Sequence, residues 1–262
     1  MQKGYLWPDN MVLNEISIHK KLENLDQCLE ACLNNKPLEL VPEIPKRDVE
    51  YLPINFLQGR LGIGNLEGQQ KLLHDLANIE LQAMELGLRT LMEFSWAPEE
   101  FKQQLVQIVL EEAKHLKMCL QGIESLGGYW GKWPVHLGLW HATHKKDSLL
   151  ERLFIVHRYL EGSGLDAGDT LLRRLSGVNN KIINEIVDTI VIEEVGHVQF
   201  GSRWYKHYIE KNKINEKQFL NRILRLVSHR HPRKDKLAQD LRIKAGFQEF
   251  ELKAIEEFRN CF

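Results

Sequence analysis

The chain contains two glutamate–histidine pairs with the spacing Glu-x-x-His, one at Glu112 and His115 and the other at Glu194 and His197. Three residues make nearly one turn of an α-helix, so the two side chains of such a pair project from the same face. Carboxylate oxygen together with imidazole nitrogen suits Fe(II) or Mn(II). One such pair is expected by chance in a chain with 11 histidines, so the argument depends on the surroundings of the pairs.

The second pair lies in strongly apolar surroundings. Three apolar residues precede Glu194 by seven, four and three positions: Val187, Ile190 and Val191. A fourth, Val198, follows it by four positions. These positions share one helical stripe, and an apolar stripe faces the core. A lone carboxylate there costs several kcal/mol unless it is protonated, paired or bound to a cation. The first pair, between Val109 and Leu116, poses the same problem.

Two further glutamates, Glu80 and Glu161, complete a set of metal ligands. Each stands on a helical segment that precedes one of the pairs, with 32 residues from Glu80 to Glu112 and 33 from Glu161 to Glu194. Such spacing brings the glutamates of each helical hairpin to the same depth. The two halves are offset by 81 or 82 residues throughout, which is the geometry of an internal duplication. We therefore predict a site with four carboxylates and two imidazoles, the pattern of a carboxylate-bridged di-metal bundle.

Other interpretations of these residues remain open. A buried acid held by an arginine, or a histidine satisfied within the core, is the alternative at each position. It is strongest at Glu161, because His157 and Arg158 flank its stripe. Glu111 and Glu193 each precede a pair and could accept the far ring N–H of a histidine across the bundle. His157 is a third candidate for such a supporting contact.

Long segments with a 3.6-residue apolar period must position these side chains. The sequence predicts four long helices. The first, second and fourth cover residues 65–96, 99–127 and 180–211, and the third begins at residue 147 or 148. The glycine-rich run at residues 162–169 predicts a bend or break in that third helix. Glu85 lies off the stripe of Glu80, four residues before Arg89, and is predicted to form a solvated ion pair with it.

The rest of the chain predicts additions around a bundle. Shorter helices are expected at residues 14–34, 219–226 and 247–258, with a proline-rich strap over residues 37–55 and an aromatic loop over residues 127–140. We expect three parts: residues 1–64 as a helix and strap packed on the bundle, 65–211 as the four-helix bundle with the metal site, and 212–262 as a helical extension. Whether the aromatic loop lines a substrate entrance stays open.

Composition supports an all-α protein. Alternating β-branched and aromatic runs are missing from the 262 residues, and the formal net charge of −1 gives no argument for nucleic acid or a membrane surface. No stretch approaches 18 uncharged apolar residues, and the N-terminus lacks the apolar segment of a signal peptide. Four cysteines without a Cys-x-x-Cys pattern favour a reduced, cytoplasmic setting.

The sequence also resembles a known superfamily. It is similar to the ferritin-like proteins, and more closely to a bacterial ferritin-like family of uncharacterised function that is related to a diiron tRNA hydroxylase acting on a prenylated adenosine. The resemblance covers residues 37–210 and rests on the segments ELVPEIPKR, HDLANIELQAMEL, EEAKHLKMCLQGIESLGGYWGKWPVHLGLW, RYLEGSGLD and IEEVGHVQFG. It implies a ferritin-like four-helix bundle in which two iron ions are bound by Glu80, Glu112, His115, Glu161, Glu194 and His197.

Three functional hypotheses follow. The first is an O2-dependent di-iron oxidase or monooxygenase acting on an organic substrate, small or nucleoside-like, with an electron-donor protein as a partner. The second is iron or peroxide handling without an organic substrate, as in a ferroxidase. The third is a bundle that uses its metal only for stability or serves in protein interaction. Manganese remains an alternative to iron, and the resemblance leaves tRNA open as a partner; no membrane partner is expected.

Overall fold

The computed structural model describes residues 12–34, 40–57, 59, 61–231 and 236–260. Helices make up the architecture of these residues, and the β-structure among them is one isolated bridge between Tyr51 and Val135. The predicted all-α class is therefore confirmed. Among the described helices, none combines the length and the apolar character that crossing a membrane requires.

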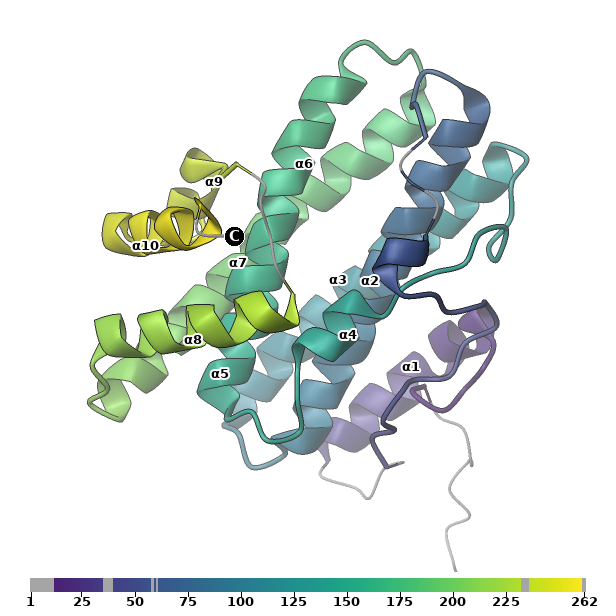
Figure 1. Cartoon of the computed structure of the whole chain (residues 1–262). Coiled ribbons are helices and arrows are strands. Elements are labelled where there is room, and N and C mark those ends of the chain that lie inside the picture. The colour runs from purple at the N-terminus through teal and green to yellow at the C-terminus, as the bar shows by residue number, and fades with distance from the viewer. Residues whose placement is uncertain (1–11, 35–39, 58, 60, 232–235, 261–262) are drawn as a thin grey trace, which may run out of the picture.

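Four long helical segments form the bundle that Figure 1 shows. The first two, α2 (Leu66–Glu93) and α3 (Glu99–Ser125), lie side by side as an antiparallel hairpin. Asn65 caps α2 by accepting a hydrogen bond from the backbone N–H of Gly68, and α3 begins directly after Pro98, which fits the first turn of a helix. The last, α7 (Lys181–Lys211), begins after Asn180, whose side chain accepts from Ile182 and Ile183.

The third segment is continuous, but it changes its winding. It consists of α5 (Leu149–Leu153), a π-helix η2 (Phe154–Leu160) and α6 (Glu161–Leu175). The predicted break at residues 162–169 is therefore wrong: α6 runs through this stretch, and the irregular winding lies in the turns just before it. Two of its glycines permit close packing, because an added Cβ would approach Arg242 at Gly162 and Val191 at Gly168.

The N-terminal part packs on the outer side of the α2–α3 hairpin. Helix α1 (Ile18–Leu33) is shorter than predicted because Ser17 caps its first turn. Lys21 of α1 and Arg47 of the strap both reach Glu85, with Lys21 Nζ 2.9 Å from Oε1 and two Arg47 nitrogens on the two carboxylate oxygens. All three side chains are fully buried. The predicted solvated ion pair of Glu85 with Arg89 is wrong, because α1 and the strap cover this face of α2.

The aromatic loop packs against the same hairpin and ends in a short helix, α4 (Gly138–Ala142). Gln82 of α2 positions it: its Oε1 accepts from the backbone N–H groups of Leu139 and Trp140, while its Nε2 donates to the carbonyl of His136. His74 stacks on Trp130 with ring centroids 4.7 Å apart. The loop is therefore part of the packed structure.

The C-terminal part consists of α8 (Glu216–Arg230), α9 (Gln239–Lys244) and α10 (Glu249–Asn260). Figure 1 shows α9 and α10 beside α6 and shows α8 crossing the end of the bundle near α5. Buried ion pairs fasten this part to the bundle. Asp166 of α6 binds Arg242 and Arg259, and Arg158 of η2 binds Glu251.

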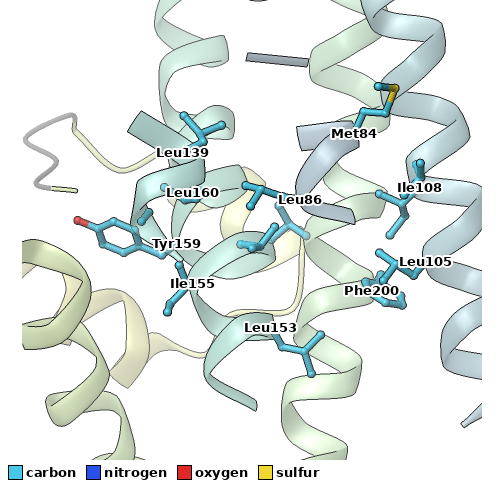
Figure 2. Close-up of a cluster of buried hydrophobic side chains, with 14 of the residues drawn as sticks. Met84, Leu86, Leu105, Ile108, Leu139, Leu153, Ile155, Tyr159, Leu160 and Phe200 are labelled. Atoms are coloured by element: carbon cyan, nitrogen blue, oxygen red, sulfur yellow. The ribbon is translucent and has the colours of Figure 1, made fainter. Parts of the chain in front are cut away.

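Apolar side chains fill the bundle next to the predicted ligands. Figure 2 shows Leu105, Ile108 and Phe200 gathered between α3 and α7, with Met84 of α2 above them. Met84 lies one turn after Glu80, Ile108 one turn before Glu112, and Phe200 about one turn after His197. All of these side chains are buried. They form an apolar layer that excludes water from one side of the ligands.

Candidate metal centre

Helices α2 and α3 bring the first group of ligands together. Glu80, Glu112 and His115 are all buried on the facing sides of this hairpin. Nδ1 of His115 lies 3.4 Å from Oε2 of Glu80 and 3.7 Å from Oε2 of Glu112. One ligand atom from each residue lies within 4.8 Å of the other two, which is compact enough to hold a metal ion.

Helix α7 adds a second group that shares Glu112. Nδ1 of His197 lies 3.0 Å from Oε1 of Glu112 and 3.1 Å from Oε2 of Glu194. One oxygen of Glu112 thus faces each histidine, and the two imidazole rings lie 5.8 Å apart. The structure therefore brings five of the six predicted ligands together, as two overlapping groups with a carboxylate between them.

Glu161, the sixth predicted ligand, stands apart from these two groups. It is buried at the start of α6, and both its oxygens lie 2.8 Å from Nδ1 of His157 in the preceding π-helical turn. Burial raises the pKa of Glu194, and the charges of Glu112 and Glu161 add to this rise. His157 thus makes the contact with Glu161 that the sequence left open, and Phe200 packs at right angles to its ring.

Two carboxylates outside the groups orient the histidines. Nε2 of His115 donates to Glu193 of α7 over 2.8 Å, and Nε2 of His197 donates to Glu111 of α3 over the same distance. Each imidazole is therefore held by the acid on the opposite helix, and its Nδ1 is left facing inward. This crossed arrangement is the supporting contact that metal-bound histidines generally have.

The electrostatics of the cluster show an excess of buried acid. Burial raises the pKa of Glu80 well above its ordinary value and that of Glu194 to about 7. Burial alone would lower the pKa of His115, but the nearby carboxylates of Glu112 and Glu80 outweigh this effect and raise its pKa to about 10. The raised pKa values of these acids reflect buried negative charge of the kind that divalent cations balance in metal sites.

Several buried polar atoms in the cluster lack a hydrogen-bond partner. These atoms are Oε1 and Oε2 of Glu112 and Nδ1 of His115. Their closest charged neighbours in the cluster lie at 3.0 to 3.7 Å. Such atoms are rare in protein interiors and call for an explanation, such as an ion. In the described part of the chain, Glu80, Glu112, Glu161 and Glu194 form their ion pairs with histidines and not with arginine or lysine.

The sequence does not predict the π-helical turn or the close approach of Gly164 to Glu194. An added Cβ at Gly164 would lie 3.3 Å from Oε1 of Glu194. The cluster of three glycines in α6 was visible in the sequence, but its partner on α7 was not. The spacing from Gly164 to Glu161 is three residues, one helical turn, and could have placed this glycine on the ligand face.

Comparisons with known proteins place the chain in a family without giving it an activity. An uncharacterized protein of Haemophilus influenzae is 29% identical over 239 residues, which cover 87% of this chain and 77% of that protein. No solved structure matches the sequence. Residues 14–253, which span the bundle together with most of both terminal parts, match the family described as "Protein of unknown function (DUF455)". The chain therefore belongs to this family.

Proposed function

We propose that this protein holds two iron ions in the cluster at the centre of its bundle and uses them as an O2-dependent oxidase or monooxygenase. The observation that supports this most strongly is the position of Glu112, buried between two histidines with one oxygen toward each. A carboxylate shared by two groups of ligands is the characteristic element of a carboxylate-bridged pair of metal ions. The resemblance of the sequence to ferritin-like proteins supports the same function.

The ligands divide naturally between two metal positions. Glu80, Glu112 and His115 would hold one ion, and Glu112, Glu194 and His197 the other. Glu161 would complete the second position by turning from His157 toward Glu194. Oxygen and nitrogen donors without a thiolate suit Fe(II), and Mn(II) is the alternative.

The chemistry of such a centre would come from the metal, and the protein would control it. Iron supplies electrons for the reduction of O2 when it is bound. Glu111 and Glu193 keep the imidazoles in one orientation, and the apolar layer around Phe200 excludes water. A further electron source is needed for repeated turnover, so we propose an electron-donor protein as a partner and a small or nucleoside-like organic molecule as the substrate.

Metal analysis followed by reaction with O2 tests this proposal. The purified protein should bind about two iron ions per chain after anaerobic loading with Fe(II). Exposure to O2 should then change the visible absorption of the loaded protein, and O2 consumption should become continuous only with an organic substrate and a reductant. The Glu112→Ala variant should fold, as checked by circular dichroism, but should neither bind two iron ions nor react with O2.

Each alternative function gives a different result in the same experiment. Oxidation of many iron ions per chain with growth of a mineral core, without any organic compound, would indicate iron handling instead. Metal binding that raises the melting temperature but leaves O2 untouched would indicate a structural role. Failure to bind metal would exclude the oxidase and the iron-handling function, and it would exclude a structural role of the metal.

A further inference from the structure

We propose that small exogenous ligands, neutral or anionic molecules of two or three atoms, reach the metal centre through an opening beside Gly164 over the carboxylate of Glu194. The inference rests on the proposed function, because it concerns access to the ions that the centre would hold. In this proposal the exposed Gly164 of α6 leaves room for a small ligand beside Glu194.

The three glycines of α6 differ in what a side chain would meet. At Gly162 an added Cβ would come within 2.9 Å of Nη1 of Arg242, and at Gly168 within 2.6 Å of a methyl group of Val191. Close packing explains both. At Gly164 the nearest atoms are Oε1 and Cδ of Glu194, at 3.3 and 4.0 Å, and no other described atom outside the backbone of α6 lies within that range.

Gly164 is also exposed, although the residues on both sides of it are buried. The exposure of the ligands agrees with an opening here. The side chain of Glu194 is 13% exposed, against 8% for Glu161 and 5% or less for the other four. The cluster therefore comes closest to solvent at the carboxylate that lies under Gly164.

The orientation of Glu194 leaves one of its oxygens available at this opening. Oε2 contacts Nδ1 of His197, whereas Oε1 is the atom that faces Gly164. An exposed glycine inside a helix costs about 1 kcal/mol relative to alanine, so α6 sacrifices stability at this position. The room that it leaves allows the Glu194 carboxylate to move and a small ligand to pass.

Gly196 provides a matched control. It is another exposed glycine within a helix, two residues after Glu194 on α7, and an added Cβ there would meet nothing within 4 Å. Two residues turn the helix by about 200°, so Gly196 faces away from the centre. The same substitution at both positions therefore has a similar effect on helix propensity but a different effect on access.

The experiment uses the full chain loaded with Co(II), with azide as the ligand. Metal content is measured first, and the rate of azide binding is then followed by stopped-flow visible absorption. The Gly164→Val variant should retain its cobalt but bind azide at least about tenfold more slowly than the unchanged protein, an effect of about 1.4 kcal/mol on the barrier. The Gly196→Val variant should bind azide at the unchanged rate.

Two results would overturn the inference. One is an equal rate of azide binding in Gly164→Val and the unchanged protein, both fully loaded; the other is a loaded, unchanged protein that does not bind azide. If Gly164→Val does not fold, the smaller Gly164→Ala is compared with Gly196→Ala, and a slower rate in the former alone supports the opening. Absence of cobalt from the unchanged protein would instead contradict the proposed function, so the two failures are distinguishable.

Discussion

The carboxylate of Glu112 faces a different histidine with each of its oxygens, whereas both oxygens of Glu161 face the same one. Glu112 belongs to both groups of ligands, whereas Glu80 belongs to only one of them. The residues of a symmetric sequence motif therefore have unequal roles in the structure.

Removal of either glutamate should show this inequality. Glu112→Ala should abolish binding of both metal ions, and Glu80→Ala should leave about one ion per chain, because the group on α7 stays intact. Metal content after dialysis measures the result, with Glu100→Ala on the exposed start of α3 as the control. Equal losses in Glu80→Ala and Glu112→Ala would contradict a shared carboxylate.

The acids that hold the outer nitrogens of the histidines should also affect the metal. Glu193→Ala and Glu111→Ala each leave an imidazole without its partner. Loss of such a contact typically weakens metal binding by about 10- to 100-fold. Competition with a chelator measures the affinity, and Glu124→Ala, exposed near the end of α3, should leave it unchanged. Unaltered affinity in all three variants would show that the crossed contacts serve the fold alone.

At this scale the sequence is informative because ligand chemistry requires particular residue types. Glu80 and Glu194 were recognisable as acids on apolar stripes, and the Glu-x-x-His spacing showed which histidines accompany them. The contact between Glu161 and His157 was harder to predict, because it depends on the winding of the backbone between them. The role of all these residues as metal ligands stays a prediction.

Helix boundaries follow from local signals, and so most of them could be predicted. Asn65, Pro98 and Asn180 mark the starts of α2, α3 and α7 within one residue of the prediction. The π-helix η2 has no comparable local signal. It packs closely on α7, because an added Cβ at Gly201 would come within 2.3 Å of Cβ of His157.

The clamp between α1, the strap and α2 should be essential for stability. Glu85→Gln removes the only negative charge of a group in which Lys21 and Arg47 are also fully buried. Removing one partner of a buried ion pair costs about 3–5 kcal/mol, because the remaining charge is left uncompensated. Urea unfolding measures the change, with Glu30→Gln on the exposed side of α1 as the control. A loss below about 1 kcal/mol, the level of an exposed pair, would contradict the clamp.

The aromatic loop should make stability depend on pH through His74. Burial, followed by the nearby charge of Lys71, lowers the pKa of His74 from 6.5 to about 4. Between these values the unfolded chain binds a proton that the folded protein does not, so stability falls as the pH is lowered from 6.5 to 4. The loss attributable to His74 reaches at most about 3 kcal/mol.

His74→Gln should remove this contribution while keeping an acceptor for the backbone N–H of Gly131. Urea unfolding at a series of pH values should then show a flatter acid side than in the unchanged protein. His141→Gln, an exposed residue of α4, should keep the original slope. The same slope in both variants would exclude His74 as the source.

On the scale of the whole molecule, the additions at both ends of the chain are fastened to the bundle near the candidate centre. Asp166, five residues after Glu161, binds Arg242 of α9 and Arg259 of α10. These contacts join residues more than 70 positions apart, and no local pattern in the sequence indicates them. The predicted division of the chain at residues 64 and 211 stays a prediction. The all-α class, by contrast, follows from the composition and the 3.6-residue period of apolar residues alone.

Metal loading should stabilise the whole chain, because the ligands come from α2, α3 and α7 and converge only in the folded state. A ligand that binds only the folded protein at 100 times its Kd contributes about 2.7 kcal/mol to the free energy of unfolding. Calorimetry with and without Co(II) measures the rise in melting temperature. The Glu112→Ala variant should melt at the same temperature in both conditions, and an equal rise in this variant would indicate binding elsewhere.

A crystal structure of the metal-loaded protein, with anomalous scattering recorded at the absorption edge of the metal, tests the central claim most directly. We expect two peaks about 3.5–4 Å apart, one on each side of the Glu112 carboxylate. We expect His115 at one peak and His197 at the other. A single peak away from Glu112, or none in a crystal grown with excess metal, would contradict the claim.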